Sequence, residues 1–329
     1  MTQGPLFTPT DDPEARAPAL SDHLEGQGAP GLAEIVQAIA EAARPIALRL
    51  ALAGLPGDPA AKTGQNASGD SQKALDLAAH DHMIAALART SVVRVVSEEA
   101  EAPITLNEAG EWDVVIDPID GSGSIGIGAP LGLLFGIFPK GESVLRPGRE
   151  MAAAGYVSFG HSTDLGVSLG AGVSLATLDP RDGVFRLTRS RAEVPPTTKM
   201  LAYNASNERH LAPGLRAYLD EARAGVTGPR GGDTNMRWIA AAVGDLHRIL
   251  IQGGVFLYPA DARPGYERGH LRLLYEAFPI AFLMEQAGGA ASDGAGPILD
   301  RSPAEIHDKT PLFFGARDEL ARLHAHLTE

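Results

Sequence analysis

Two apolar, β-branched runs in this chain each end in a pair of acidic side chains. The run SVVRVVSEE predicts a strand that ends at Glu98 and Glu99. The run WDVVIDPID predicts a second strand, with Asp117 and Asp120 at its end. Open α/β sheets bind their ligands at the carboxyl ends of their strands. We therefore expect an α/β fold in which both strands deliver carboxylates to the edge where ligands bind.

Acidic residues are concentrated around these two strands. Residues 70–120 contain eleven Asp and Glu against three Lys and Arg, so about a sixth of the chain carries −8 of the formal net charge of −13. A solvated acidic surface explains any one of them. Together they favour a basin of carboxylates that holds divalent cations. The excess of acid argues against a nucleic-acid partner, because phosphate backbones attract clustered Lys and Arg.

The chain of 329 residues contains no cysteine. Disulfides, thiolate metal sites and cysteine nucleophiles are therefore excluded, and any bound metal must have oxygen or imidazole ligands. The histidines show no H-E-x-x-H or similar spacing, which argues against a zinc site.

The segment DPIDGS, residues 117–122, is the strongest single motif. Its two carboxylates, with the carbonyl of Ile119 between them, can converge on a hard cation such as Mg²⁺. The backbone N–H groups of Gly121 and Ser122 can then cradle a phosphate. Taken alone, the motif fits an ordinary turn that closes a strand equally well. The surrounding acids favour the metal site.

Hydrophobic spacing and turn residues divide the chain into elements and domains. Apolar residues at helical spacing predict helices near residues 32–48, 71–89, 211–223, 236–252 and 278–289. Apolar runs broken by Gly and Asp predict an antiparallel meander over 151–190. Because Pro195-Pro196 marks a boundary, we expect a flexible segment, an N-terminal α/β domain with the acidic basin, and a C-terminal α/β domain, at 1–30, 31–196 and 197–329.

The sequence predicts neither a targeting signal nor a membrane helix. The first twenty residues contain acids and prolines where a signal peptide needs a basic start and an apolar stretch. Residues 121–139 carry no charge, but their glycines and prolines favour loop and strand over a membrane helix. We expect a cytoplasmic protein with no membrane partner.

Taken in order, the motifs of the chain resemble those of class I fructose-1,6-bisphosphatase, a branch of the sugar and inositol phosphatase superfamily. The matching segments are Asn66-x-x-Gly69-Asp70 with Asp76, Ser97-Glu98-Glu99, WDVVIDPIDGS, DLHRILIQGGVFLYP, and LRLLYEAFP with LMEQAGG. The resemblance begins near Gly31 and implies a five-layer αβαβα fold (α/β, or α+β in some schemes). It also implies an N-terminal regulatory-type domain, a C-terminal sugar-phosphate domain and a homotetramer.

The resemblance also implies roles for individual residues. It implies about two or three Mg²⁺ ions per subunit, with Mn²⁺ as an alternative. The implied metal ligands are Glu98, Asp117, Ile119 through its carbonyl, Asp120 and Glu276. The residues implied in activating the attacking water are Asp76, Glu99 and, from a mobile loop, Asp70. The implied substrate-binding residues are Gly121, Ser122 and Arg272 at the 1-phosphate, and Asn204, Asn207, Arg237, Tyr258 and His270 at the 6-phosphate. The arginine at 237 would reach into a neighbouring subunit.

Several positions depart from the family pattern. Asn207 and Trp238 stand where tyrosines are common, and His270 stands where a lysine is expected. A second lysine of the same loop is Arg263, and the loop 261–269 is slightly longer than usual. Four acids of the basin have no implied role and are expected to be solvated surface, namely Glu101, Glu108, Glu111 and Asp113.

The family's AMP-binding segment also reads differently here. The usual Thr-Gly-Glu-Leu-Thr is Ala-Pro-Gly-Leu-Ala at 29–33, and the usual Lys-Tyr pair is Glu111-Trp112. A glutamate repels a nucleotide phosphate. We therefore predict no inhibition by AMP.

The leading hypothesis is metal-dependent hydrolysis of the 1-phosphate of fructose 1,6-bisphosphate, in gluconeogenesis or the Calvin cycle. Sedoheptulose 1,7-bisphosphate, or activity on both sugars, is the nearest alternative. An inositol-type monophosphatase is less favoured, because it would not need a second phosphate pocket. A non-catalytic, metal-binding relative is disfavoured because all matched carboxylates are retained.

Overall fold

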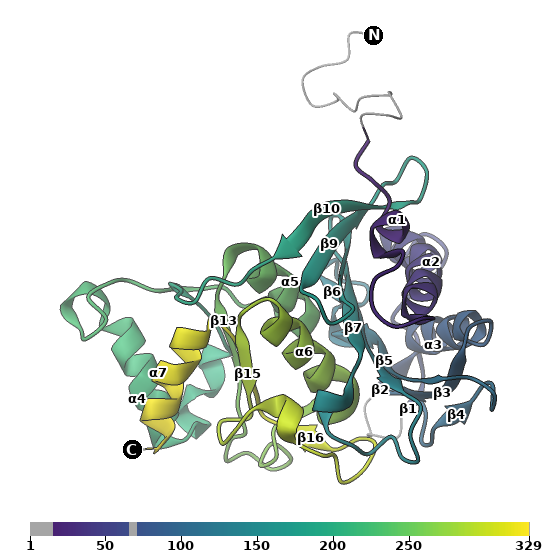
Figure 1. The fold of residues 1–329 in the computed structure, drawn as a ribbon. Helices are drawn as coiled ribbons and strands as arrows, with labels where there is room; N and C mark the ends of the chain where they lie inside the picture. The colour runs from purple at the N-terminus through teal and green to yellow at the C-terminus, as the bar shows by residue number, and fades with distance from the viewer. Residues whose placement is uncertain (1–15, 66–70, 329) are drawn as a thin grey trace.

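Two sheets with helices between and around them form the framework of the molecule (Figure 1). The computed structural model describes residues 16–65 and 71–328. Asp70, an expected catalytic residue, lies outside the described residues, as do residues 1–15 of the segment expected to be flexible. The described half of that segment contains helix α1 (Leu20–Leu24), whose two leucines are buried.

The larger sheet has eight strands, and its long apolar runs are covered on both faces. In it β3 pairs with β5 in parallel, and its other neighbouring pairs are antiparallel. In spatial order the strands are β10 (Phe185–Ala192), β9 (Val173–Leu178), β8 (Thr163–Ser168), β7 (Ala153–Phe159), β6 (Leu131–Pro139), β5 (Trp112–Asp120), β3 (Val92–Ser97) and β4 (Ile104–Thr105). Every residue of β5 is buried, as expected for a strand between two helical layers. The predicted meander over 151–190 is confirmed as β7 to β10.

The smaller sheet has five strands and follows the larger one in the sequence. In spatial order its strands are β12 (Asn235–Met236), β11 (Met200–Ala202), β13 (Val255–Tyr258), β17 (Leu312–Gly315) and β15 (Ala290–Ser292). The predicted boundary at Pro195-Pro196 falls between the last strand of the larger sheet and β11. Two short ribbons complete the strands: β1 (Lys62–Gln65) with β2 (Ser71–Lys73), and β14 (Leu271–Arg272) with β16 (Lys309–Thr310).

The helices form three layers around the two sheets (Figure 1). One layer covers the outer face of the larger sheet and consists of α1, α2 (Leu32–Ala51) and α3 (Ala74–Leu87). The middle layer lies between the sheets and consists of α5 (Ala242–Gln252) and α6 (Phe278–Gln286). The third covers the smaller sheet and consists of α4 (Pro213–Arg223) and α7 (Arg317–Thr328). This order confirms the five-layer αβαβα fold. Among the described residues, no helix has the length and apolar character needed to cross a membrane.

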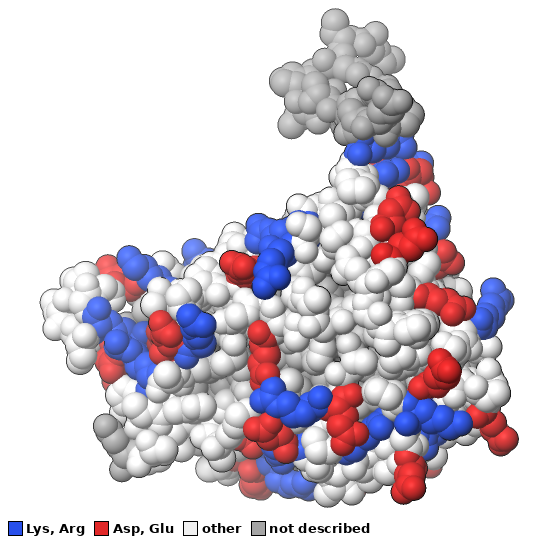
Figure 2. Space-filling model, in the orientation of Figure 1, with Lys and Arg blue, Asp and Glu red and all other residues white. Residues whose placement is uncertain are grey.

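The acidic excess of the sequence lies partly inside the fold. Asp113, expected on the solvated surface, is buried; its carboxylate accepts hydrogen bonds from Arg94 at 2.8 and 2.9 Å and from Arg146 at 3.0 Å. That expectation was wrong because a strand flanked by two arginines can bury an acid. On the face drawn in Figure 2, Lys and Arg lie among Asp and Glu rather than apart from them.

Candidate active site

The parallel pairing of β3 with β5 brings the two acidic strand ends together. Ser97 is in register with Ile116, and the N–H of Glu98 donates to the carbonyl of Ile116 at 3.1 Å. The carboxyl ends of both strands therefore meet at one edge of the larger sheet, as the sequence predicted. Glu98 and Asp117 face each other across this edge, with oxygens within 4.8 Å.

A third carboxylate reaches this edge from the C-terminal half of the chain. Glu276 lies in a single π-helical turn, Leu273–Ala277, directly before α6. Such turns interrupt regular helices mostly at functional sites. One carboxylate oxygen of Glu276 accepts the N–H of Arg272 at 2.8 Å, and the group lies within 4.8 Å of both Glu98 and Asp117. The three side chains form a cluster that could hold a metal ion.

Asp120 and Ile119 border this cluster on the same strand. The N–H of Val243, at the start of α5, donates to one oxygen of Asp120 at 2.8 Å. The N–H of Ile119 donates to Asp117 at 2.9 Å. These bonds fix the DPIDGS segment against the middle helical layer, so that the sheet and α5 together position its carboxylates.

The carboxylates of the cluster destabilise one another's charged forms. Burial is the main cause that raises the pKa of Glu98 to about 7 and of Asp120 to about 6, and it raises the pKa of Asp117 and Glu276 well above the usual range. Repulsion within the cluster adds to the rise for Glu98, Asp117 and Glu276. Arg272 opposes it, with its guanidinium 3.4 Å from Glu98 and 3.6 Å from Glu276. The charge of one guanidinium does not balance several buried carboxylates, so bound metal cations could neutralise the remaining negative charge.

The donor set fits divalent cations with oxygen ligands. The clustered side chains offer only carboxylate oxygens, which Mg²⁺ and Mn²⁺ prefer. Asp76, in the first turn of α3, accepts the N–H of Lys73 at 3.0 Å with one oxygen. Its other oxygen is buried and has no hydrogen-bond partner among the described residues. Burial raises the pKa of Asp76 to about 6. The oxygen without a partner could accept a hydrogen bond from a water molecule if cations were bound at this site.

The turn after Asp120 is built for a close approach of the backbone. Gly121 has a φ of 77°, in the left-handed region, and a Cβ there would lie 2.7 Å from the Cβ of Ala241. Only glycine fits both conditions. A 3₁₀ turn, Ser122–Ser124, follows, and the N–H of Ser124 donates to the carbonyl of Gly121 at 2.8 Å. We call residues 121–123 the phosphate turn, after the phosphate that the sequence predicts their N–H groups to bind.

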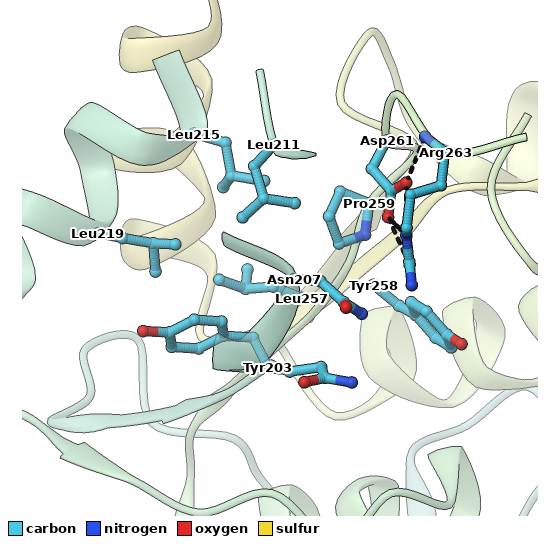
Figure 3. Close-up of a pocket in the computed structure, with 11 residues that line it drawn as sticks. Tyr203, Asn207, Leu211, Leu215, Leu219, Leu257, Tyr258, Pro259, Asp261 and Arg263 are labelled. Atoms are coloured by element: carbon cyan, nitrogen blue, oxygen red, sulfur yellow. Dashed lines mark hydrogen bonds and ion pairs between the residues drawn. The ribbon is translucent and has the colours of Figure 1, made fainter. Parts of the chain in front are cut away.

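One cavity of about 480 Å³ joins these groups to the second half of the chain. It is lined by Glu99, the phosphate turn, the carboxylates described above and Arg272 beside them. The second half of the chain adds Asn204, Trp238, Phe256, Tyr258 and His270 to the lining of the cavity. Of the described residues that the sequence assigned to the site, Asn207 and Arg237 do not line it. Arg237 is exposed, and Asn207 lines a smaller pocket beyond Asn204 and Tyr258 (Figure 3).

Sequence reasoning missed Lys73. Its ammonium donates to the carbonyl of Ser122, so it links the start of α3 to the phosphate turn, and it lines the cavity. Lys73 is one of three basic residues in the acidic stretch 70–120, and a base among so many acids was the available signal.

Two family descriptions match consecutive parts of the chain. Residues 19–190 match the fructose-1-6-bisphosphatase N-terminal domain, and residues 194–328 match the C-terminal domain of the same enzyme. The chain belongs to the fructose-1,6-bisphosphatase family. The resemblance predicted from the motifs is therefore confirmed over nearly the whole length.

Individual fructose-1,6-bisphosphatases are similar along the same length. The class 1 enzymes of Brucella anthropi and Brucella suis biovar 1 are each 46% identical over 323 residues, which is 96% of this chain and 95% of each relative. The crystal structure of Leishmania major fructose-1,6-bisphosphatase in holo form has a TM-score of 0.89 at 31% identity, and covers 95% of this chain and 99% of that one. The apo form of the same enzyme has a TM-score of 0.84.

Proposed function

We propose that the chain hydrolyses the 1-phosphate of fructose 1,6-bisphosphate to fructose 6-phosphate and phosphate, as a phosphoric monoester hydrolase. The observation that carries this proposal is that one cavity joins the carboxylate cluster and Arg272 to Asn204, Tyr258 and His270. A phosphate ester needs the first group for hydrolysis. The polar residues from the second half of the chain would bind a second, distal phosphate of the same substrate.

Divalent cations are the cofactor that this site supports. When bound, about two or three Mg²⁺ ions, or Mn²⁺ in their place, would neutralise the ester phosphate and lower the pKa of a water molecule. The residues that would hold them are Glu98, Asp117, Asp120, Glu276 and the carbonyl of Ile119.

The side chains around the cluster position and deprotonate the attacking water. Asp76 is the proposed proton acceptor, because a pKa of about 6 suits a base at neutral pH. Glu99 raises that pKa through its charge and is assigned to the same step, with Asp70. The backbone N–H groups of Gly121 and Ser122 bind the transferred phosphate, and Arg272 balances its charge.

The distal phosphate is assigned to the opposite side of the cavity. Asn204, Tyr258 and His270 line that side, and Asn207 lies in the adjoining pocket. Arg237 is exposed and outside the cavity of its own chain, which supports its use by a neighbouring subunit. We therefore propose that the protein is a homotetramer. We also propose that it is cytoplasmic and serves gluconeogenesis or the Calvin cycle. Its two domains are proposed to meet at residue 196.

Phosphate release from a panel of sugar phosphates tests the reaction. With Mg²⁺ we expect fructose 1,6-bisphosphate to be hydrolysed with a lower KM than fructose 1-phosphate, and inositol 1-phosphate to be a poor substrate. EDTA should abolish release, and Mg²⁺ or Mn²⁺ should restore it. Equal KM values for the bisphosphate and the monophosphate would contradict the bisphosphatase assignment. Activity that persists in EDTA would contradict the metal-dependent mechanism.

Sedoheptulose 1,7-bisphosphate belongs in the same panel as the alternative substrate. The observation that keeps it open is the altered loop at the cavity, where His270 and Arg263 stand in place of the lysines expected in the family. The pocket beside Asn207, at about 20 Å³, has room for about one water molecule and does not itself accommodate a phosphate. Comparable kcat/KM values for the two bisphosphates would identify a dual enzyme.

We expect AMP to have no effect on the rate. Gly31 precedes α2 with a φ of 87°, and a Cβ there would lie 3.0 Å from the indole nitrogen of Trp112. The indole therefore packs against the start of α2, beside residues 29–33, which differ from the family's AMP-binding segment. Assays at saturating Mg²⁺ with increasing AMP should give a constant rate. A loss of activity that follows the AMP dose would show that a nucleotide still binds.

A further inference from the structure

Tyr258 and His270, which line the cavity, are followed by Tyr266 and Arg263 in a row of neighbouring side chains. The rings of Tyr266 and His270 are nearly parallel, at 12°, with centroids 5.3 Å apart. The guanidinium carbon of Arg263 lies 4.0 Å from the centroid of the Tyr266 ring. His270 in turn lies 5.5 Å from the ring of Tyr258. The Tyr266 ring thus contacts one side chain that lines the cavity and one that lines the adjoining pocket.

Asp261 also holds Arg263 in place. The carboxylate of Asp261 accepts the backbone N–H of Arg263 at 2.9 Å, its Nε at 2.9 Å and its Nη2 at 2.6 Å. These bonds hold the pKa of Asp261 below its usual value. Figure 3 shows the guanidinium group extending from Asp261 toward Tyr258. A guanidinium group held by two such hydrogen bonds has a fixed orientation.

The path of the loop does not depend on the Tyr266 ring. The backbone of Tyr266 donates to the carbonyl of Arg263 at 3.0 Å and accepts from Asp261 at 3.1 Å and Gly269 at 3.0 Å. Gly269 has a φ of 83°, and a Cβ there would lie 2.3 Å from the backbone of Thr310 and Pro311. The loop is therefore fixed by its main chain, so the ring is available to order His270 and, together with Asp261, Arg263.

We propose that Tyr266 is a positioning residue for substrate binding, whose ring holds His270 and Arg263 beside Asn204 and Tyr258 as donors to the distal phosphate. The inference rests on the proposed function, because it needs a substrate with a second phosphate. His270 and Arg263 stand where lysines are expected in the family. An imidazole on a loop needs a fixed ring plane to aim its N–H, and a parallel aromatic neighbour supplies it.

The decisive variants are Tyr266→Ala and Tyr266→Phe, measured in the Mg²⁺-loaded enzyme. We expect Tyr266→Ala to raise KM for fructose 1,6-bisphosphate about tenfold, because a stacking contact and a cation–π contact are lost together. Its kcat should stay within about twofold of the parent. Tyr266→Phe keeps both ring contacts and should restore the parent KM. The KM for fructose 1-phosphate, which has no distal phosphate, should be unchanged in both variants.

Arg268→Ala is the matched control in the same loop. Arg268 is 63% exposed and pairs with Asp308, so this variant removes a loop cation without touching the Tyr266 ring. Its KM should equal that of the parent. The proposal is wrong if Tyr266→Ala leaves KM for the bisphosphate unchanged, or raises KM for fructose 1-phosphate by the same factor, as general damage to the site would.

Calorimetric titration with fructose 6-phosphate separates this proposal from the proposed function. This probe carries only the distal phosphate, so its binding does not depend on hydrolysis. Affinity about tenfold weaker in Tyr266→Ala supports the positioning role even if the parent hydrolyses no bisphosphate, a result that would overturn the proposed function alone. Equal affinity in the parent and Tyr266→Ala overturns the positioning role whatever the parent hydrolyses.

Discussion

We expect Asp120→Asn to lower kcat by about a thousandfold and to leave the metal-free protein at least as stable as the parent. The substitution removes a charged oxygen ligand from the strand end where Asp117 and Glu98 also lie. The remaining amide oxygen can still accept the N–H of Val243, which donates to Asp120 at 2.8 Å. Activity and folding therefore separate in this variant, since the lost charge serves the metal and the retained hydrogen bond serves the fold.

The stability of Asp120→Asn should depend on pH in a defined direction. Burial raises the pKa of Asp120 to about 6, above its value in the unfolded chain. At pH 8 the metal-free fold holds this carboxylate ionised at a cost that the unfolded chain does not bear. As pH falls below 6 the folded carboxyl takes up a proton and the cost shrinks, and it is gone only below the ordinary aspartate pKa of 3.8, where the unfolded chain is protonated too. In EDTA the thermal midpoint of Asp120→Asn should exceed that of the parent at pH 8, and the difference should narrow below pH 6 and vanish near pH 4.

Asp81→Asn is the control for the change in charge. Asp81 is exposed on α3, within the same acidic stretch, and does not line the cavity. It should retain the kcat of the parent. Full activity in Asp120→Asn would mean that the cluster is structural and that catalysis occurs elsewhere.

Local sequence patterns predicted the parts of the fold that local interactions determine. The strand at 112–120 and the acids at its end followed from a β-branched run and a proline. The helix expected over 236–252 begins only at Ala242, because Asn235–Met236 pair as an edge strand and Ala240 has a φ of 69°. Helix α7 was not predicted, since Leu320 and Leu323 are the buried leucines of an otherwise charged segment.

The site itself could be predicted only where a single stretch of chain forms it. Glu98, Asp117 and Asp120 were expected from their own strands, because parallel neighbours end at the same edge. Glu276 lies more than 150 residues away in the sequence, and only the family resemblance identified it. Arg237 is exposed and does not line the cavity of about 480 Å³, so its proposed role would need a subunit contact, which no single-chain pattern encodes.

Arg272→Met should lower activity, as Asp120→Asn should, but it should have the opposite effect on stability. Arg272 is buried and lies 3.4 Å from Glu98 and 3.6 Å from Glu276. Without its charge the buried carboxylates repel one another uncompensated, and the metal-free protein should lose about 3 kcal/mol of unfolding free energy. Activity should fall about a hundredfold or more, since the same guanidinium is proposed to face the transferred phosphate.

Metal ions provide the sharper readout for Arg272→Met. Mg²⁺ supplies the missing positive charge, so it should raise the thermal midpoint of this variant more than that of the parent, and Asp120→Asn should respond less than either. Arg149→Met is the matched control, because Arg149 pairs with Glu285 and Asp300 outside the cavity. Combining Asp120→Asn with Arg272→Met should recover part of the metal-free stability and none of the activity. Equal stability of Arg272→Met and the parent in EDTA would contradict this prediction. It would mean that the charge of Arg272 does not stabilise the carboxylate cluster in the metal-free protein.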